Sequence, residues 1–383
     1  MNTDLRGSIL IFQRLIPLYR VPFFRYLYKE CGTVVCYSRT RKGSSLKSAE
    51  LIDIPVILLK RIIFPISESY IYQKVLPTLF RIRPPVVVCE GSPSYLTLWI
   101  LLLYRFFFRY KLIIWTHGIR FYELDKPFTS MRGKVLRWLY NQADGLIVYS
   151  DSRAGVIKKH IHRPQKVFVA RNTIDTSELL TLYTRHQTAG KEKIKQELGI
   201  THHKNIVFIG RLVPRKRIDI LLKAFALIPV TRDIGLQILG NGPDEALVRQ
   251  YAEKYPNIHY HGPVYDMNLN TRFLYASDLM VMPGYVGLAI VHAFAMGCPV
   301  ITCVSSTGIN LHSPEIEYLK HGINGLVCDL IPEELASLTV SLLEDDNRLK
   351  SLSRQALHTA YHEADLKHML TGFQNAFSFV KNL

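Results

Sequence analysis

Two basic side chains flank a predicted turn in the second half of the chain. The apolar run Asn205-Ile-Val-Phe-Ile leads to Gly210, and Arg211 and Lys216 follow, five residues apart. Glycine allows a sharp turn at the end of a strand. A guanidinium offers a planar fork of donors, and an ammonium acts as a point charge. Two such cations around one turn can neutralise a diphosphate.

A second stretch, LMVMPGYVGLAIVHAFAMGCPVIT at 279–302, has the pattern of a strand, a glycine-containing turn and a helix. We expect the strand to end before Gly284 and the helix to open at Gly287. The first amides of a helix have no internal acceptor, and the aligned peptide dipoles leave partial positive charge there. The first amides of the helix that opens at Gly287 are therefore expected to bind a phosphate.

The elements that position these residues follow from short apolar runs separated by gaps that can hold helices. This alternation predicts an α/β fold with parallel sheets buried on both faces. Residues 176–204 are polar, with one short helix predicted at 191–198, so we place a domain boundary near 175–204. In the first half the predicted strands are 9–12, 33–37, 56–59, 86–89, 112–115, 146–149 and 167–170.

The charge of the 383-residue chain is unevenly distributed. Residues 1–183 contain 28 Lys and Arg against 12 Asp and Glu, whereas residues 184–383 contain 20 against 19. Such asymmetry predicts that the first half faces an acidic partner: anionic lipid, a diphosphate-lipid or nucleic acid. The alternative is that these cations only solvate helix faces. The six cysteines have no spacing typical of a metal site or a disulfide framework.

Aromatic and basic residues alternate in QRLIPLYRVPFFRYLYKE, directly after the first predicted strand. Arg14, Tyr19 and Arg20 are expected at the carboxyl edge of the sheet, where open α/β folds bind ligands. A membrane-interface patch and a core helix with exposed arginines are the alternatives. Two more strand ends at this edge carry Glu90, and His117 with Arg120.

Three further segments have open interpretations. The helix predicted at 95–110 is apolar nearly all round, and we favour a buried crossover helix over one that touches a membrane. Gly240 and Gly242 form a fragment of a dinucleotide-binding fingerprint, which we interpret as a turn. Ser313-Pro314-Glu315 is typical of the start of a helix.

In order and spacing, FIGRLVPRKRIDILLKAF, LGNGPDEALV, PGYVGLAIVHAFAMGCPVIT and HSPEIEYLKHGINGLV resemble the donor domain of family-four glycosyltransferases of GT-B fold. The resemblance over the first half is weaker and rests on WTHG, VARNTID and the strand order. It implies two Rossmann-like domains facing across a cleft: an acceptor domain at 1–183, a nucleotide-sugar domain at 200–360, and a final helix at 361–383 that returns to the first domain.

The resemblance implies a role for each matching position. Arg211 and Lys216, after Gly210, match the pair that holds the donor diphosphate, and the loop of Val286, Gly287 and Leu288 matches the one beside the transferred sugar. His117 matches a residue that contacts this sugar. The family's two glutamates, separated by seven residues, are replaced by Gly284 and His292.

We expect these replacements to affect the donor. A single imidazole cannot accept hydrogen bonds from both ribose hydroxyls, which would suit a deoxyribose, and Gly284 would leave space open beside the sugar. Loss of activity is the alternative.

The function implied is retaining, metal-independent transfer from a nucleotide-diphosphate sugar to a lipid-linked or lipopolysaccharide acceptor, at the cytoplasmic face of an anionic membrane and without a cofactor. Arg14, Tyr19, Arg20, Glu90 and Arg120 would lie on the acceptor side. The alternatives are a non-catalytic nucleotide-sugar-binding partner of another transferase, a nucleic-acid-binding protein, for which no reading motif is present, and an NAD-dependent oxidoreductase, which only the broken glycine fingerprint supports.

Overall fold

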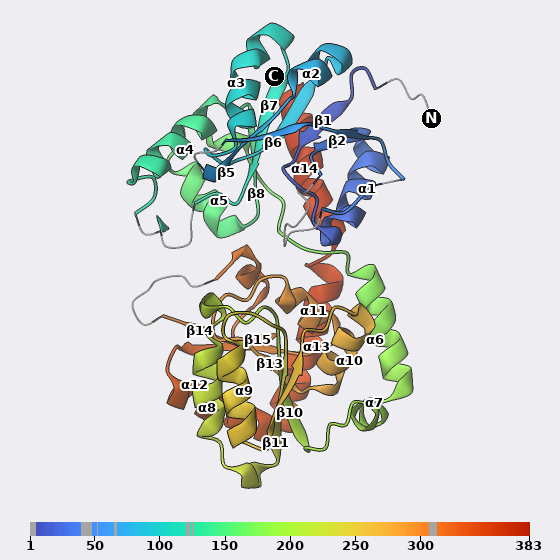
Figure 1. Cartoon of the computed structure of the whole chain (residues 1–383), viewed down its shortest axis with the longest axis vertical. Helices are drawn as coiled ribbons and strands as arrows, with labels where there is room; N and C mark the ends of the chain where they lie inside the picture. The colour runs from blue at the N-terminus through green and yellow to red at the C-terminus, as the bar shows by residue number, and fades with distance from the viewer. Residues whose placement is uncertain are drawn as a thin grey trace. The chain divides into compact units, whose positions relative to one another are not determined.

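The computed structural model divides into two compact units (Figure 1). Unit 1 comprises Met1–Ile174 and Leu366–Leu383, and unit 2 comprises Asp175–Asp365. The residues described are 5–39, 48–51, 53–64, 67–119, 123–124, 126–305 and 312–383. Each unit is an α/β structure around a parallel sheet, which confirms the predicted fold class.

The sheet of unit 1 has the strand order β3-β2-β1-β6-β7-β8-β9, and every pairing is parallel. All seven strands predicted for the first half are present. Their bounds are β1 (Ile9–Phe12), β2 (Thr33–Tyr37), β3 (Val56–Leu58), β6 (Val86–Glu90), β7 (Lys111–Thr116), β8 (Gly145–Val148) and β9 (Val167–Val169).

Helices cover both faces of this sheet because alternate strand residues point to opposite sides. Leu10 and Val87 belong to one core, with α2 (Leu76–Ile82), α3 (Leu96–Phe108), α4 (Met131–Gln142) and α5 (Asp151–Lys158). Ile11 and Val88 belong to the other core, with α1 (Val21–Cys31) and α14 (Leu366–Lys381). The sequence did not predict the antiparallel hairpin of β4 (Arg61–Phe64) and β5 (Ser67–Gln73).

Only one stripe of α3 is buried, so the expectation of a fully buried helix is wrong for its outer face. Leu98 and Leu101 are fully buried against the sheet. Leu103, Phe106 and Phe107, on the outer side, are 59%, 72% and 76% exposed. A helix that is apolar nearly all round can therefore have one buried face and one exposed face.

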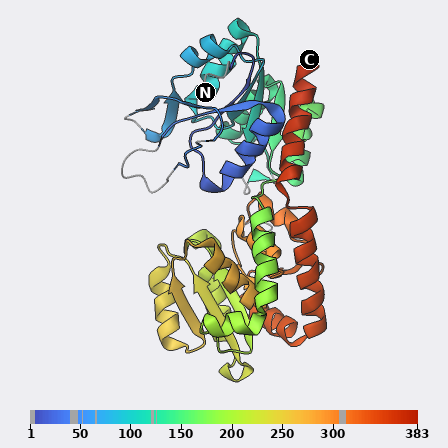
Figure 2. The same ribbon diagram turned by 90° about the vertical axis from the view of Figure 1, so that its right-hand side faces the viewer.

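The sheet of unit 2 has the strand order β12-β11-β10-β13-β14-β15, again parallel. The strands are β10 (Lys204–Ile209), β11 (Ile234–Leu239), β12 (Ile258–Gly262), β13 (Leu279–Val281), β14 (Val300–Val304) and β15 (Gly325–Asp329). Figure 2 shows helices on both sides of this sheet. One group contains α8 (Ile218–Ala226), α9 (Glu245–Lys254) and α12 (Pro332–Glu344); the other contains α6 (Ser177–Ala189), α7 (Lys191–Glu197), α10 (Met267–Ala276), α11 (Ala289–Ala295) and α13 (Asp346–His362).

The two units meet in the sequence at different residues from those expected. Residues 175–183, which we expected in the first domain, belong to unit 2 because α6 packs on α10 and α11. His186 Nε2 lies 3.0 Å from Thr271 Oγ1 in this contact. The final segment of unit 1 starts at Leu366 rather than at residue 361, because α13 still packs on α11.

Candidate functional site

The site in unit 2 is built on the loop that follows β10. Gly210 takes a φ of +153°, which L side chains rarely adopt. The chain then makes the 3-10 turn Pro214–Lys216, and Arg217 takes a left-handed φ of +54° before α8. This path folds the side chain of Lys216 back toward the strand end, so that a Cβ on Gly210 would lie 3.7 Å from Lys216 Nζ.

Lys216 is buried in this loop, with 8% of its surface exposed. Its Nζ donates to Val286 O at 3.0 Å and lies 3.1 Å from Met282 Sδ. Its Nζ also lies 5.8 Å from the centroid of the Tyr285 ring. An ammonium carries three protons, and Val286 and Met282 are its only hydrogen-bond partners among the residues described, so one proton is available to a ligand. Burial, followed by the charge of Arg215, lowers the pKa of Lys216 to about 8, while Glu315 opposes the shift. The group is thus charged at neutral pH and poorly hydrated.

The loop 283–288 lies directly against the loop of Lys216. Gly284 N–H donates to Lys216 O at 3.1 Å, and Tyr285 N–H donates to Arg215 O at 2.9 Å. The Arg215 guanidinium also lies over the Tyr285 ring, 4.4 Å from its centroid. The two segments that the sequence singles out are therefore adjacent within one unit.

The helix expected to open at Gly287 is α11, which begins two residues later, at Ala289. Gly287 takes a left-handed φ of +64° and its N–H donates to Ser313 Oγ at 2.9 Å. This amide is therefore already satisfied, contrary to the expectation that it binds a phosphate. The amides of Val286, Leu288 and Ala289 have no acceptor in the part of the chain that the structure describes, and they are the available donors of this loop.

A third loop, after β11, supports the first. A Cβ on Gly240 would lie 1.8 Å from Gly210 O, and one on Gly242 would lie 2.2 Å from Leu212 O. Leu212 N–H donates to Asn241 O at 2.8 Å across this contact. The two glycines therefore permit a close approach of backbones, in agreement with their interpretation as a turn.

Arg211, the second predicted cation, lies on the surface of the loop. Within the described ranges its guanidinium makes no hydrogen bond or ion pair, so it can contact a solute. The two cations thus differ: Lys216 is buried and held by hydrogen bonds, whereas Arg211 is exposed and has no described hydrogen-bond or ion-pair partner.

In unit 1, Arg14 and Glu90 form a forked ion pair at the carboxyl ends of β1 and β6. Arg14 Nε donates to Glu90 Oε2 at 2.9 Å, and the second nitrogen of the fork bonds the other carboxylate oxygen. Both side chains are about one third exposed or less. The pair satisfies both charges at an edge that still meets solvent.

His117 follows β7 at the same edge and keeps contact with solvent. Its ring centroid lies 4.6 Å from that of Tyr149. Although the residue is exposed, desolvation by its neighbours, followed by the charges of Arg153, Arg20 and Arg14, lowers the pKa of His117 to about 4. The imidazole is therefore neutral at physiological pH and can donate one hydrogen bond and accept one.

Arg20 is a core residue, which corrects its predicted place on an acceptor surface. It is 4% exposed and donates to Asn172 Oδ1 and, at 3.3 Å, to Thr173 O. Aromatic rings, including those of Phe23 and Trp115, surround its guanidinium. Tyr19 is 43% exposed. Arg120 lies outside the described residues.

Two family models match the chain: "Glycosyltransferase Family 4" over residues 24–178 and "Glycosyl transferases group 1" over residues 203–345. The N-acetyl-alpha-D-glucosaminyl L-malate synthase of Bacillus anthracis is 22% identical over 277 residues, which are 70% of this chain and 68% of that protein. The D-inositol 3-phosphate glycosyltransferase of Mycobacterium leprae is 32% identical, but the match spans 46% of this chain and less than half (42%) of that protein.

Solved structures share the fold of this chain. Anabaena Alr3699/HepE in complex with UDP superposes with a TM-score of 0.73 at 18% identity, over 97% of this chain and 99% of that one. WaaG, a glycosyltransferase involved in lipopolysaccharide biosynthesis, superposes with a TM-score of 0.65 at 14% identity, over 95% and 98%. The chain thus matches glycosyltransferase family models in both units and has a GT-B fold.

Gly284 does not leave open space beside the donor loop, contrary to the expectation from the sequence. A Cβ built on it would lie 2.2 Å from Arg215 O and 2.8 Å from the carbonyl carbon of Lys216. The position is filled by the backbone of the neighbouring loop, so the missing side chain creates no cavity there.

His292 lies in the middle of α11 and is partly buried. Burial lowers the pKa of His292 to about 4, so its imidazole is neutral at physiological pH. Its ring nitrogens make no hydrogen bond within the described part of the chain.

Sequence reasoning missed the role of Ser313. Its hydroxyl makes no cap bond to the 3-10 helix Pro314–Tyr318 and instead accepts from Gly287. Sequence reasoning also assigned no role to Arg215, whose guanidinium lies over the Tyr285 ring. Its position next to Lys216 in the sequence could have indicated a place in the same loop contact. Within the described residues, no group of three or more His, Cys, Asp and Glu could hold a metal ion. None of the helices in this part of the chain is long and apolar enough to cross a membrane.

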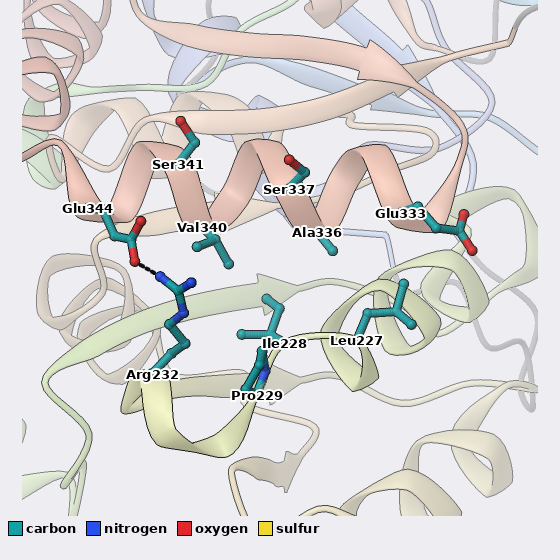
Figure 3. Close-up of a pocket in the computed structure, with 10 residues that line it drawn as sticks. All are labelled: Leu227, Ile228, Pro229, Arg232, Glu333, Ala336, Ser337, Val340, Ser341 and Glu344. Atoms are coloured by element: carbon teal, nitrogen blue, oxygen red, sulfur yellow. Dashed lines mark ion pairs between the residues drawn. The ribbon is translucent and has the colours of Figure 1, made fainter.

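Two hollows in unit 2 lie away from these loops. One, of about 560 Å³, lies between 227–232 and α12, where Arg232 pairs with Glu344 (Figure 3). The other, of about 640 Å³, includes Lys191 and Lys204. No predicted site residue lines either hollow.

Proposed function

We propose that this chain transfers a sugar from a nucleoside-diphosphate sugar to a glycan or lipid-linked acceptor in bacterial surface polysaccharide or lipopolysaccharide synthesis. The observation that carries the proposal is the fixed, buried ammonium of Lys216 beside the loop that presents the amides of Leu288 and Ala289. The names of similar proteins support it: Alr3699/HepE was solved with UDP-glucose, and WaaG is involved in lipopolysaccharide biosynthesis.

In this proposal, cleavage of the sugar–phosphate bond leaves negative charge on the diphosphate. Lys216 and Arg211 stabilise this charge, because cations placed before the reaction need no rearrangement as it develops. The acceptor hydroxyl attacks on the face that the nucleotide leaves, which retains the anomeric configuration and requires no metal. Its oxygen bonds to the anomeric carbon as the sugar–phosphate bond breaks, and its proton passes to the departing diphosphate. Neutral His117 contacts the transferred sugar through a hydrogen bond.

We further propose that unit 1 holds the acceptor near the Arg14–Glu90 pair and Tyr19, and that it meets an anionic membrane at the cytoplasmic face. The excess of basic residues in the first half of the chain supports this contact. A lipid-linked acceptor would then lie at the same surface as the protein.

The test is a donor screen. UDP, GDP and dTDP sugars are each added in thermal-shift measurements, since a ligand that binds only the folded state raises the melting temperature. Donors that bind are then tested for transfer to lipid-linked and lipopolysaccharide acceptors. The proposal fails if no nucleoside diphosphate raises the melting temperature.

A second candidate is a non-catalytic homologue that binds nucleotide sugars as a partner of another transferase. The replacement of both family glutamates, at Gly284 and His292, favours it. Calorimetry that shows donor binding, without transfer to any acceptor and without donor hydrolysis, would support this candidate over the enzyme.

A further inference from the structure

The outer face of α3 is apolar from end to end, although it faces solvent. Leu103 lies one helical turn before Phe106 and Phe107, and the three side chains are 59%, 72% and 76% exposed. A surface helix normally carries polar residues on its outer face. Exposed apolar surface of this extent marks a contact with a partner or a membrane.

Neighbouring helices extend this surface. The exposed ring of Phe80 on α2 contacts Phe108 of α3, with centroids 4.8 Å apart. On the other side, Trp138 of α4 is stacked on Trp99 of α3 at 5.8 Å. The three helices are neighbours on one side of the sheet (Figure 1). We call this surface the aromatic face; it consists of Phe80, Leu103, Phe106, Phe107 and Trp138.

The aromatic face is bordered by cations and lacks acids. The helices α2, α3 and α4 contain no Asp or Glu. Arg81 and Arg83 at the end of α2, and Arg109 after α3, are exposed, and no ion pair to another described residue involves them. No described residue supplies the charge that would complement this border, which fits an anionic partner.

We propose that the aromatic face docks on an anionic phospholipid bilayer, with its rings at the headgroup boundary and the bordering arginines on lipid phosphates. This inference rests on the proposed function and assigns its membrane contact to a surface. Aromatic rings and cations on flexible stems both suit that boundary. At 13 residues, α3 is too short to span the bilayer and would lie along it.

Charge also argues against a second copy as the occupant. A two-fold dimer places the same patch on both subunits. The bordering arginines of the two copies would then face each other without acidic partners and repel. Anionic lipid removes this repulsion.

The test is co-sedimentation of the full chain with vesicles of phosphatidylcholine alone, or with about one third phosphatidylglycerol. We expect binding only to the anionic vesicles. Phe106→Ser with Phe107→Ser should lower the partition coefficient at least about tenfold, since each ring loses its burial in the interface. Replacing Arg81, Arg83 and Arg109 by Gln should lower it about fivefold per arginine at low salt.

Matched controls come from unit 2. Tyr265→Ser removes a ring that is 85% exposed, and Gln at Arg348, Lys350 and Arg354 removes three exposed cations from α13. These variants should bind vesicles as the unchanged chain does. Equal binding by the aromatic-face variants, or no binding of the unchanged chain to anionic vesicles, would overturn the proposal.

Two measurements separate this inference from the proposed function. UDP affinity by calorimetry should be unchanged in the aromatic-face variants, because the proposed donor site lies in unit 2, and thermal unfolding should show that unit 1 still folds in them. Sedimentation equilibrium should show a monomer. A dimer that Phe106→Ser with Phe107→Ser dissociates would assign the face to a second copy and overturn membrane docking.

Discussion

The ammonium of Lys216 lies 3.0 Å from the carbonyl oxygen of Val286, and this contact joins the two loops on which the proposed donor site depends. The loops follow β10 and β13, neighbouring strands of the unit 2 sheet whose parallel pairing places both carboxyl ends at one edge. Two of the three protons of the Lys216 ammonium are donated to Val286 O and Met282 Sδ, so its position is fixed before any ligand binds.

Loss of either cation should slow sugar transfer. Lys216→Ala or Arg211→Ala is expected to lower kcat by about 10² or more, the effect of removing one preorganised donor to a developing negative charge. Steady-state transfer assays measure it. Arg354→Ala, an exposed arginine on α13, should leave kcat unchanged. Full activity in both site variants would show that neither cation stabilises the leaving group.

The affinity for a nucleoside diphosphate should fall in alkaline solution. The pKa of Lys216 is about 8 rather than the usual 10.5, so its ammonium loses its proton above pH 8 in the free protein. Because a bound anion raises this pKa, the affinity should decrease about tenfold per pH unit from pH 8 until the pKa of the bound state is reached. Calorimetry with UDP between pH 6.5 and 9.5 tests this, and Lys216→Arg should flatten the profile because arginine does not titrate there.

A side chain at position 284 should damage the fold of the site. Gly284→Ala places a Cβ 2.2 Å from Arg215 O, and the shift needed to relieve the clash should cost about 1–3 kcal/mol of unfolding free energy. Gly155→Ala, in α5, meets nothing within 4 Å and should be neutral or slightly stabilising. Urea unfolding measures both. An unchanged stability in Gly284→Ala would mean that the two loops are less closely packed.

The residue at 292 should influence the choice of nucleotide. His292→Glu introduces a carboxylate that can accept from both ribose hydroxyls, whereas the neutral imidazole accepts one bond. We expect the ratio of UDP to dTDP affinity to rise about tenfold or more, the size of one hydrogen bond to a charged group. Competition calorimetry gives this ratio. A ratio that does not change would place His292 away from the ribose.

Arg20 should matter for stability. Arg20→Ala leaves the carbonyl of Thr173 without this donor and removes a buried guanidinium, for a loss of about 3 kcal/mol. Arg25→Ala, which breaks an ion pair with Asp53 between half-exposed side chains, should cost about 0–1 kcal/mol. If Arg20→Ala were as stable as Arg25→Ala but lost acceptor binding, the first interpretation of Arg20 as an acceptor residue would be right.

Much of this arrangement could be predicted from the sequence because it depends on apolar runs and strand ends. Buried parallel strands such as β1 and β7 are continuous hydrophobic segments, and the edge where they end follows from their direction. Strand β12 was missed because IHYHG is an edge strand with few apolar residues.

The details that were wrong depend on contacts between distant segments. Alternating arginines and aromatic rings look the same in a surface patch and in a core where the rings surround Arg20. Likewise, Ser313 has the sequence context of a helix cap, and only the fold shows that its hydroxyl accepts from Gly287. Neither contact has a local signature.

The most direct test of the central claim compares UDP with uridine, by calorimetry, in the unchanged chain and in Lys216→Gln. If the diphosphate binds between Lys216 and the loop 286–289, the unchanged chain should bind UDP far more tightly than uridine. Lys216→Gln should then lose UDP affinity at least about tenfold while its uridine affinity stays the same. An equal loss for both ligands, or no loss for either, would contradict the assignment of the diphosphate to this site.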